Sequence, residues 1–342
     1  MAALCVLMFV ANTASPFKTS FLPDALVDFI KLTVLYYLTV SVTRTEQDVE
    51  TFIRILFVFG SVITLYSLVG YRIGWETPVY RMVSPFGGMG SNSNGFAMLL
   101  LSLLPFTMMY MLRQESPIRK LIYIVIALGI VMCIIKTRSR MGFLGLMLQF
   151  CIFAWDKRKK AGALLLVVLI IAVAMLRANE NLWDRVATIS QQTEDFSEYS
   201  PARKNKWRQA ALLIAQRPIT GVGISRFRQA VMHNELGEFE HVVHNAYLEI
   251  GVETGIVNMV LFTLLIFGHI RRSFKAYLLF YRQDNTTLHD VNRAIFIASL
   301  IFAFCLILLS EQYNSMLYIL LGLAAGCDRI AANYHTKPVE LS

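Results

Sequence analysis

The chain alternates long apolar runs with short polar segments. A transmembrane helix needs about 20 predominantly apolar residues to cross about 30 Å of hydrocarbon. The pattern therefore predicts an all-α fold, a polytopic membrane protein of about ten transmembrane helices in a single integral membrane domain over residues 1–342. The predicted spans cover about 2–14, 25–43, 51–71, 95–112, 119–136, 141–155, 162–177, 244–268, 292–310 and 315–331.

The first run, residues 2–14, is too short to cross a membrane cleanly. It is also preceded by no basic segment and followed by no clear small-residue cleavage site, so we do not predict a removable signal peptide. We expect the chain to begin inside a longer reading frame or to be an N-terminally truncated form.

Lysine and arginine in the short loops predict the orientation. The strongest cluster, Asp156–Lys160, should face the cytoplasm, and alternation places Arg113–Lys120 and Arg271–Arg282 on the same side. The longest remaining loop, 178–243, is then extracytoplasmic. Loops longer than about 60 residues escape the positive-inside rule, so its many cations do not contradict this topology. We predict an inner-membrane protein whose chemistry lies on the extracytoplasmic face.

The long loop contains one segment with helical periodicity. Ser200-Pro201 predicts a helix start, Arg217-Pro218 predicts its end, and Gly221-Val222-Gly223 predicts a turn. The expected apolar stripe comprises Trp207, Ala211, Leu212, Ile214 and Ala215. The expected polar face comprises Arg203, Lys204, Lys206 and Arg208. This pattern indicates an amphipathic helix that lies in the outer membrane interface.

Composition and charge agree with this picture. Hydrophobic residues make up 56% of the chain and the mean hydropathy is +0.54, against roughly 45–50% apolar residues in soluble domains. The net charge of +9 comes from cations in the loops, so membrane lipids and lipid phosphates, not nucleic acid, are the expected anionic partners. The five cysteines have no paired spacing, which argues against a disulfide framework or a zinc site.

Two outer segments carry candidate chemistry. Lys136–Arg140 places three cations on a very short outer hairpin, where arginine forks could bind a diphosphate or could snorkel at a helix end. His244 precedes Asn245, a good N-cap, at the predicted outer end of a span. A neutral histidine there could accept a proton from a hydroxyl, or it could be a satisfied interfacial side chain. His241 is a competing candidate.

Acidic and glycine residues follow the histidine. Gly251 and Gly255 form a GxxxG pattern, which usually indicates close helix packing. Glu253, four residues after Glu249, is costly at membrane depth unless paired, either with the outer arginines or by orienting His244. Gly221 and Gly223 could present N–H groups to an anion but equally suit a plain turn. The segment 86–94 could face a sugar or could form a turn and an N-cap.

In this order, the segments resemble the O-antigen ligase and polymerase family of bacterial envelope enzymes, over about residues 80–270. The match comprises Ser139–Gly142, Arg203 with Trp207, Arg217–Gly223, and His244-Asn245 with Glu253–Gly255. The resemblance implies glycan transfer from an undecaprenyl-diphosphate carrier, without metal, nucleotide sugar or other cofactor. The ligase branch delivers the glycan to the lipid A core, and the polymerase branch delivers it to another carrier-linked glycan.

Carried over by position, the resemblance implies that Arg140 and Arg203 bind the donor diphosphate, with Arg138 adjacent to the match. It implies that His244 assists the acceptor hydroxyl. The supporting residues would be Asn245, Glu253, Trp207, Gly221 and Gly223. Family members usually carry more spans upstream than this chain does. A transporter or flippase for a lipid-linked or anionic solute, and an inactive scaffold in a polysaccharide assembly complex, are the alternatives from other classes.

Overall fold

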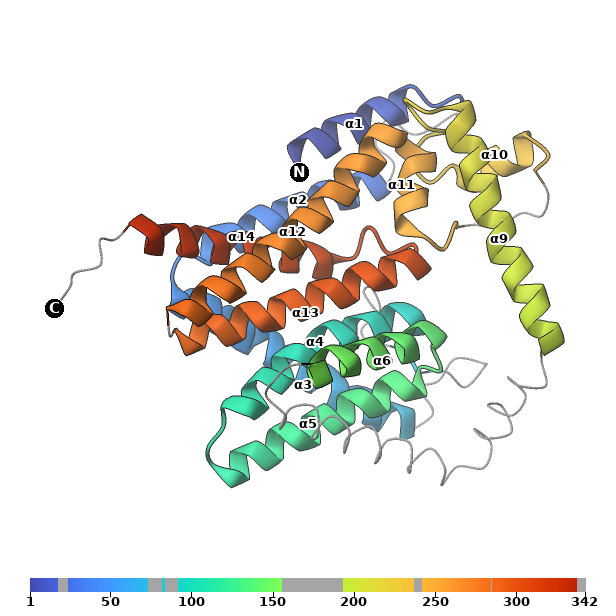
Figure 1. Cartoon of the computed structure of the whole chain (residues 1–342). Helices are drawn as coiled ribbons and strands as arrows, with labels where there is room; N and C mark the ends of the chain where they lie inside the picture. Colours follow the sequence, from blue (N-terminus) through green and yellow to red (C-terminus); the bar gives the residue numbers. More distant parts are fainter. Residues whose placement is uncertain are drawn as a thin grey trace. The chain divides into compact units, whose positions relative to one another are not determined.

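The computed structural model describes residues 1–17, 24–72, 82–83, 92–155, 193–236, 242–283 and 285–336 (Figure 1). Every regular element in these ranges is an α-helix, so the predicted all-α fold class is confirmed. The helices are α1 (Ala2–Thr13), α2 (Asp24–Val42), α3 (Glu46–Arg72), α4 (Ser93–Arg113), α5 (Pro117–Lys136), α6 (Arg140–Trp155), α9 (Thr193–Gln216), α10 (Phe227–His233), α11 (Ala246–Thr254), α12 (Ile256–Arg282), α13 (Thr286–Leu308) and α14 (Ser315–Thr336).

Seven of the described helices are long and apolar enough to cross a membrane: α2, α3, α4, α5, α12, α13 and α14. Two shorter apolar helices, α1 and α6, match the predicted runs 2–14 and 141–155. The predicted span 162–177 and the basic cluster 156–160 lie outside the described residues. The protein is therefore a multi-pass membrane protein.

The predicted continuous span over 244–268 was wrong, because the helix breaks at Gly255. Gly255 adopts a positive φ of 89°, which separates the short α11 from the membrane-length α12. A Cβ at this position would lie 2.2 Å from the backbone oxygen of Ile219. The N–H of Ile256 donates to the carbonyl of Pro218 at 2.7 Å. The apolar pattern of 244–268 shows that burial is favourable but not where the helix stops. The break is imposed by the backbone of Pro218 and Ile219, which is distant in sequence.

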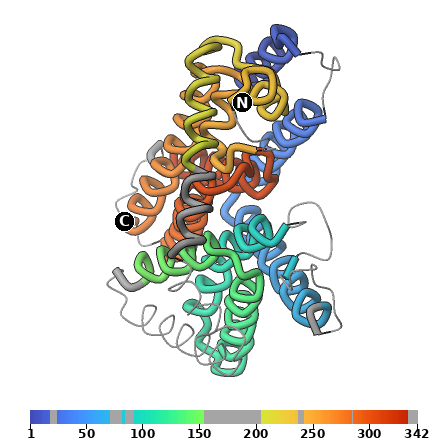
Figure 2. Tube along the Cα trace, turned by 90° about the vertical axis from the view of Figure 1, so that its right-hand side faces the viewer, coloured from blue at the N-terminus to red at the C-terminus, as the bar shows by residue number. Residues whose placement is uncertain are grey.

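The chain folds as two compact units. Unit 1 comprises residues 1–34, 174–267 and 306–314, and unit 2 comprises 35–173, 268–305 and 315–342. In unit 2, α4 packs against α3, α5 and α6, and Figure 2 shows the blue trace of α3 beside the cyan and green traces of the other three helices. Arg113 at the end of α4 pairs with Glu50 at 3.4 Å and with Asp290 at 3.2 Å, which links three helices near their ends.

In unit 1, α9 packs against α11, and α10 contacts both helices (Figure 1). Their shared apolar core comprises Ala210, Leu213, Ile214, Val222, Phe227, Ala230, Val231, Val243 and Val252, with Trp207 packed against it. The helix α9 begins at Thr193, so the predicted start at Ser200 was wrong.

The predicted apolar stripe of α9 was only partly correct. Trp207 and Ile214 face the core, but Ala211, Leu212 and Ala215 are exposed. Lys206, expected on the polar face, is buried. The core face is set at positions 207, 210, 213 and 214 because the chain after α9 folds back and packs there. The apolar face at these four positions therefore packs against protein, which the sequence pattern alone could not distinguish from a membrane interface.

Candidate functional site

The arginine hairpin joins α5 to α6 through three residues, Thr137–Ser139. The sequence predicts a very short hairpin here, and the three-residue connection confirms it. Arg138 takes a positive φ of 52°, and its N–H donates to the carbonyl of Ile135 at 2.9 Å. The Ser139 hydroxyl accepts the N–H of Gly142 at 3.1 Å, which caps the first turn of α6. Hydrogen bonds within the hairpin thus define the turn without the arginine side chains.

The two arginine side chains of the hairpin lie at the N-terminal end of α6. Arg140 is the first residue of that helix and is exposed, while Arg138 is half-buried. A helix N-terminus carries a partial positive charge and attracts anions. Arginine forks at such a helix end have the chemistry to bind a phosphate group.

The start of α11 places His244 in an unusual conformation. Asn245 caps the helix as predicted, because its Oδ1 accepts the N–H groups of Tyr247 and Leu248 at 3.1 Å each. His244 is half-buried and has a positive φ of 58°. For a residue with a Cβ, this left-handed conformation costs roughly 1–2 kcal/mol. Such backbone strain persists only where surrounding contacts impose it.

Those contacts come from the segment that follows α13. The backbone N–H of His244 donates to the Ser310 hydroxyl oxygen at 3.0 Å. Two residues later, the N–H of Ala246 donates to the carbonyl of Leu309 at 3.0 Å. The end of α13 thus contacts the chain on both sides of the N-cap.

The helix α11 carries two buried carboxylates, those of Glu249 and Glu253. Glu249 Oε2 accepts the N–H of Val243 at 3.2 Å and the hydroxyl of Ser310, and its side chain also bonds Gln312. Burial raises the pKa of Glu249, an effect that these donors partly offset. The predicted pairing of these acids with arginines is not seen among the described residues: backbone N–H groups, hydroxyls and an amide replace them.

Glu253 lies one turn further along α11 and is 3% exposed. Its Oε1 accepts the N–H of Ser225 at 2.8 Å, and its Oε2 accepts the hydroxyl of Tyr313 at 3.3 Å. Burial raises the pKa of Glu253 well above its usual value, and the nearby Glu249 carboxylate raises it further. Glu253 therefore ties the turn after Gly223 to the segment after α13.

The Gly221-Val222-Gly223 turn is confirmed, with φ of 65° and 103° at the two glycines. Its N–H groups are engaged within the protein: Val222 donates to the carbonyl of Val252 at 2.8 Å, and Gly223 donates to that of Glu253 at 2.9 Å. The last carbonyls of a helix lack partners within the helix. The turn therefore completes the end of α11, and these N–H groups are not available to an anion.

The structure brings one group of predicted residues together and leaves others undescribed. His244, Asn245, Glu253, Trp207, Gly221 and Gly223 all belong to unit 1, around α11. Arg203 lies on α9, but its side chain is outside the described residues, as are His241 and 86–91. Asn92 caps α4 by accepting the N–H of Gly95 at 2.6 Å. Arg138 and Arg140 belong to unit 2.

A family model described as O-antigen ligase matches residues 124–263. Over this stretch, the chain is similar to the O-antigen ligase family. The match runs from within α5 to the start of α12 and includes the arginine hairpin, α9, the glycine turn and α11. It supports glycan handling of the O-antigen ligase or polymerase type. No curated protein matches the chain.

The O-antigen ligase match does not include the segment that holds the start of α11. Ser310, Gln312 and Tyr313, which contact His244, Glu249 and Glu253, follow α13 and were not predicted as site residues. The sequence does carry a signal for them. Ser310–Asn314 is a run of five polar residues between two apolar helices.

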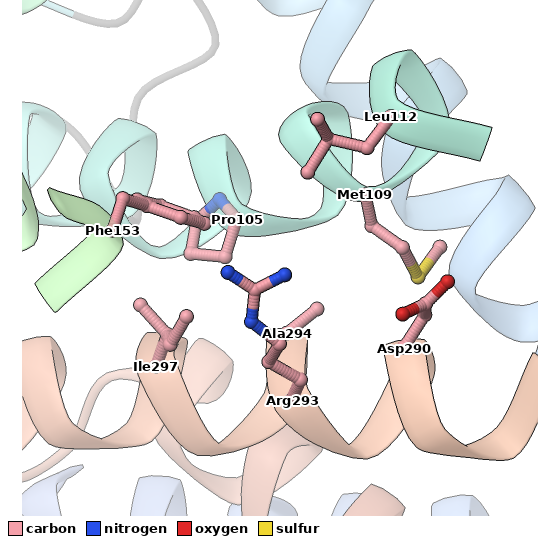
Figure 3. A pocket seen from close by; sticks show the side chains of 8 residues that line it. All are labelled: Pro105, Met109, Leu112, Phe153, Asp290, Arg293, Ala294 and Ile297. Carbon is pink, nitrogen blue, oxygen red and sulfur yellow. The ribbon is translucent and has the colours of Figure 1, made fainter. Parts of the chain in front are cut away.

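A pocket in unit 2 lies between α4, α6 and α13, and Figure 3 shows the Arg293 side chain directed from α13 toward Pro105 and Phe153. The guanidinium carbon of Arg293 lies 5.5 Å from the centre of the Phe153 ring. The space open to a water centre is about 10 Å³, roughly enough for a single water. The pocket is therefore too small for a glycan.

Proposed function

We propose that the protein transfers a glycan from an undecaprenyl-diphosphate carrier to an acceptor hydroxyl at the periplasmic face of the bacterial inner membrane. The proposed acceptor is the lipid A core, as in an O-antigen ligase. The observation that carries the proposal is the O-antigen ligase match over residues 124–263, which contains both the arginine hairpin and the His244 helix start. The seven candidate membrane spans suit a carrier that lies in the bilayer.

The proposed reaction is a direct displacement at the anomeric carbon. The acceptor oxygen forms a bond to this carbon, and the bond to the diphosphate oxygen breaks, with the electron pair leaving on the diphosphate. The hydroxyl proton passes to the neutral imidazole of His244. A single displacement inverts the anomeric centre. A diphosphate is already a good leaving group, so the mechanism needs no general acid.

The arginines supply the electrostatic part of this chemistry. Negative charge develops on the leaving diphosphate, and preorganised donors stabilise that charge; losing one typically lowers the rate about 10²–10³-fold. Arg140 and Arg203 are the proposed donors, with Arg138 beside them, because the forked guanidinium group matches phosphate oxygens. A positioned base contributes roughly 10²–10⁴-fold. Glu253 supports the base by holding α11 in place.

Deletion of the gene, followed by analysis of surface polysaccharide, tests this function. We expect glycan attachment to be lost while carrier-linked chains accumulate, and we expect a plasmid copy to restore attachment. A copy with His244→Ala should insert normally but fail to restore it. Single unpolymerised repeat units would instead indicate a polymerase. Loss of carrier-linked glycan from the outer leaflet would indicate a flippase, and full rescue by the His244→Ala copy would rule out His244 as the base.

A further inference from the structure

We propose that Ser310 is a positioning residue that holds His244 in its working orientation. This inference rests on the proposed function of His244. Ser310 lies immediately after α13, 66 residues from His244 in sequence, and outside the O-antigen ligase match. The two residues meet through a hydrogen bond of 3.0 Å from the backbone N–H of His244 to the Ser310 hydroxyl oxygen.

The direction of each hydrogen bond in this group is determined by chemistry. A backbone N–H can only donate, so the Ser310 oxygen is the acceptor for His244. The Ser310 hydroxyl hydrogen is then directed to Glu249 Oε2, which also accepts the N–H of Val243 at 3.2 Å. Glu249 thereby orients the Ser310 hydroxyl, and the hydroxyl oxygen is presented to His244. All three partners belong to unit 1.

This arrangement accounts for the left-handed backbone of His244. A φ of 58° directs the side chain of residue 244 away from the course it would follow in an extended segment leading into α11. Ser310 contacts the chain before the Asn245 cap, and Leu309 contacts it after the cap. With both sides held, the direction of the His244 Cα–Cβ bond is fixed relative to α11. Without the Ser310 hydroxyl, the strained backbone could relax to a negative φ, and the side chain would leave α11 in a different direction.

Kinetic comparison of Ser310 variants tests the proposal. Full-length protein would be purified in detergent and assayed with purified carrier-linked glycan. We expect Ser310→Ala to lower kcat about 10–100-fold with little change in the KM for the donor, because misplacing a catalytic group by about 1 Å can cost 10²-fold. Ser310→Thr keeps the hydroxyl and should restore most of the rate. Ser102→Ala is the matched control, because that buried hydroxyl donates only to Met98 within its own helix.

A double-mutant cycle with His244→Ala separates positioning from a general structural role. If Ser310 acts only through the imidazole, Ser310→Ala should cause no further loss in a His244→Ala background. An equal loss in both backgrounds would show a structural effect and overturn the proposal.

If Ser310→Ala does not insert stably, Ser310→Cys replaces it. The thiol is a poorer acceptor, so an intermediate rate is expected, and a wild-type rate would overturn the proposal.

The same cycle distinguishes failure of this inference from failure of the proposed function. Wild-type activity in Ser310→Ala, with His244→Ala impaired, would overturn only the positioning role. Wild-type activity in His244→Ala would overturn the base assignment itself, and the positioning role would fall with it.

Discussion

At the scale of single residues, the two hairpin arginines differ in position although they carry the same charge. Arg140 is exposed at the first residue of α6, whereas Arg138 is half-buried within the turn and strained at a φ of 52°. The positive φ of Arg138 is a property of the tight backbone turn of the hairpin. Arg140 is therefore the better candidate for binding a mobile lipid diphosphate.

Substitution of these arginines tests the phosphate-binding proposal. We expect Arg140→Ala to lower glycan transfer about 10²–10³-fold, and Arg140→Lys to lose much of the rate because lysine lacks the planar fork. Arg138→Lys should have a smaller effect. The measurement is transfer from purified carrier-linked glycan, with membrane insertion checked by immunoblot. Near wild-type transfer by Arg140→Ala would favour the snorkelling interpretation instead.

Glu253 offers a prediction about stability and pH. Its pKa is raised in the folded protein, chiefly by burial, so the native state binds this proton more tightly than the unfolded chain does. The group therefore favours folding below its ordinary pKa of 4.5, and that contribution is lost as the pH rises through the raised pKa. Glu253→Gln keeps an acceptor for the N–H of Ser225 and removes the ionisable group. Its amide N–H would face the Tyr313 oxygen, which would then accept the hydrogen bond that it donates in the wild type.

We accordingly expect Glu253→Gln to raise the Tm in detergent relative to the wild type at high pH. The difference should be small at pH 5 and larger at pH 9, as measured by scanning fluorimetry. Glu115→Gln, at an exposed position between α4 and α5, is the control and should follow the wild type. A lower Tm for Glu253→Gln at every pH would show that the carboxylate is needed in its charged form.

At the scale of elements, the break between α11 and α12 separates the candidate site from a membrane span. The Gly221-Val222-Gly223 turn donates N–H groups to the last carbonyls of α11, and the carbonyl of Pro218 accepts the first N–H of α12. Two glycines that the sequence presents as a pair have different roles here. Gly251 lets α11 approach Met259 and Ile214, whereas Gly255 provides the break itself.

This difference predicts unequal effects of the same substitution. Gly255→Ala would place a Cβ 2.2 Å from the Ile219 oxygen and would force a positive φ on alanine, which costs about 1–2 kcal/mol for the backbone alone. Gly251→Ala meets the flexible Met259 side chain at 2.9 Å and should be tolerated better. Yield of monodisperse protein and Tm measure both. Equal losses in the two variants would argue for a simple packing pair.

At the scale of the whole molecule, the function depends on which face of the membrane each loop occupies. We predict that 178–243 is extracytoplasmic and that 156–161 is cytoplasmic, from the distribution of lysine and arginine. Single cysteines at positions 158 and 195 of a variant lacking the five native cysteines can be labelled with a membrane-impermeant reagent in intact spheroplasts. We expect labelling at 195 only. Labelling at 158 with none at 195 would invert the topology and remove the functional proposal.

The sequence by itself determined the local features of this protein. Apolar runs identified α1–α6, α13 and α14 because the tendency of a segment to be buried depends on its own composition. The short arginine hairpin, the Asn245 cap and the glycine turn were predicted because capping and turn chemistry act within a few residues. The ordered motifs also indicated the family before the match over 124–263 confirmed it.

Tertiary structure alone decided the break at Gly255, the buried face of α9 and the contact of Ser310 with His244. Each depends on segments that are distant in sequence and meet only after folding. A run of apolar residues does not specify whether lipid or protein covers it, and a serine after a helix does not specify which N–H it will accept. The His244-Asn245 helix start is therefore encoded locally, but its backbone geometry is set by the residues that follow α13.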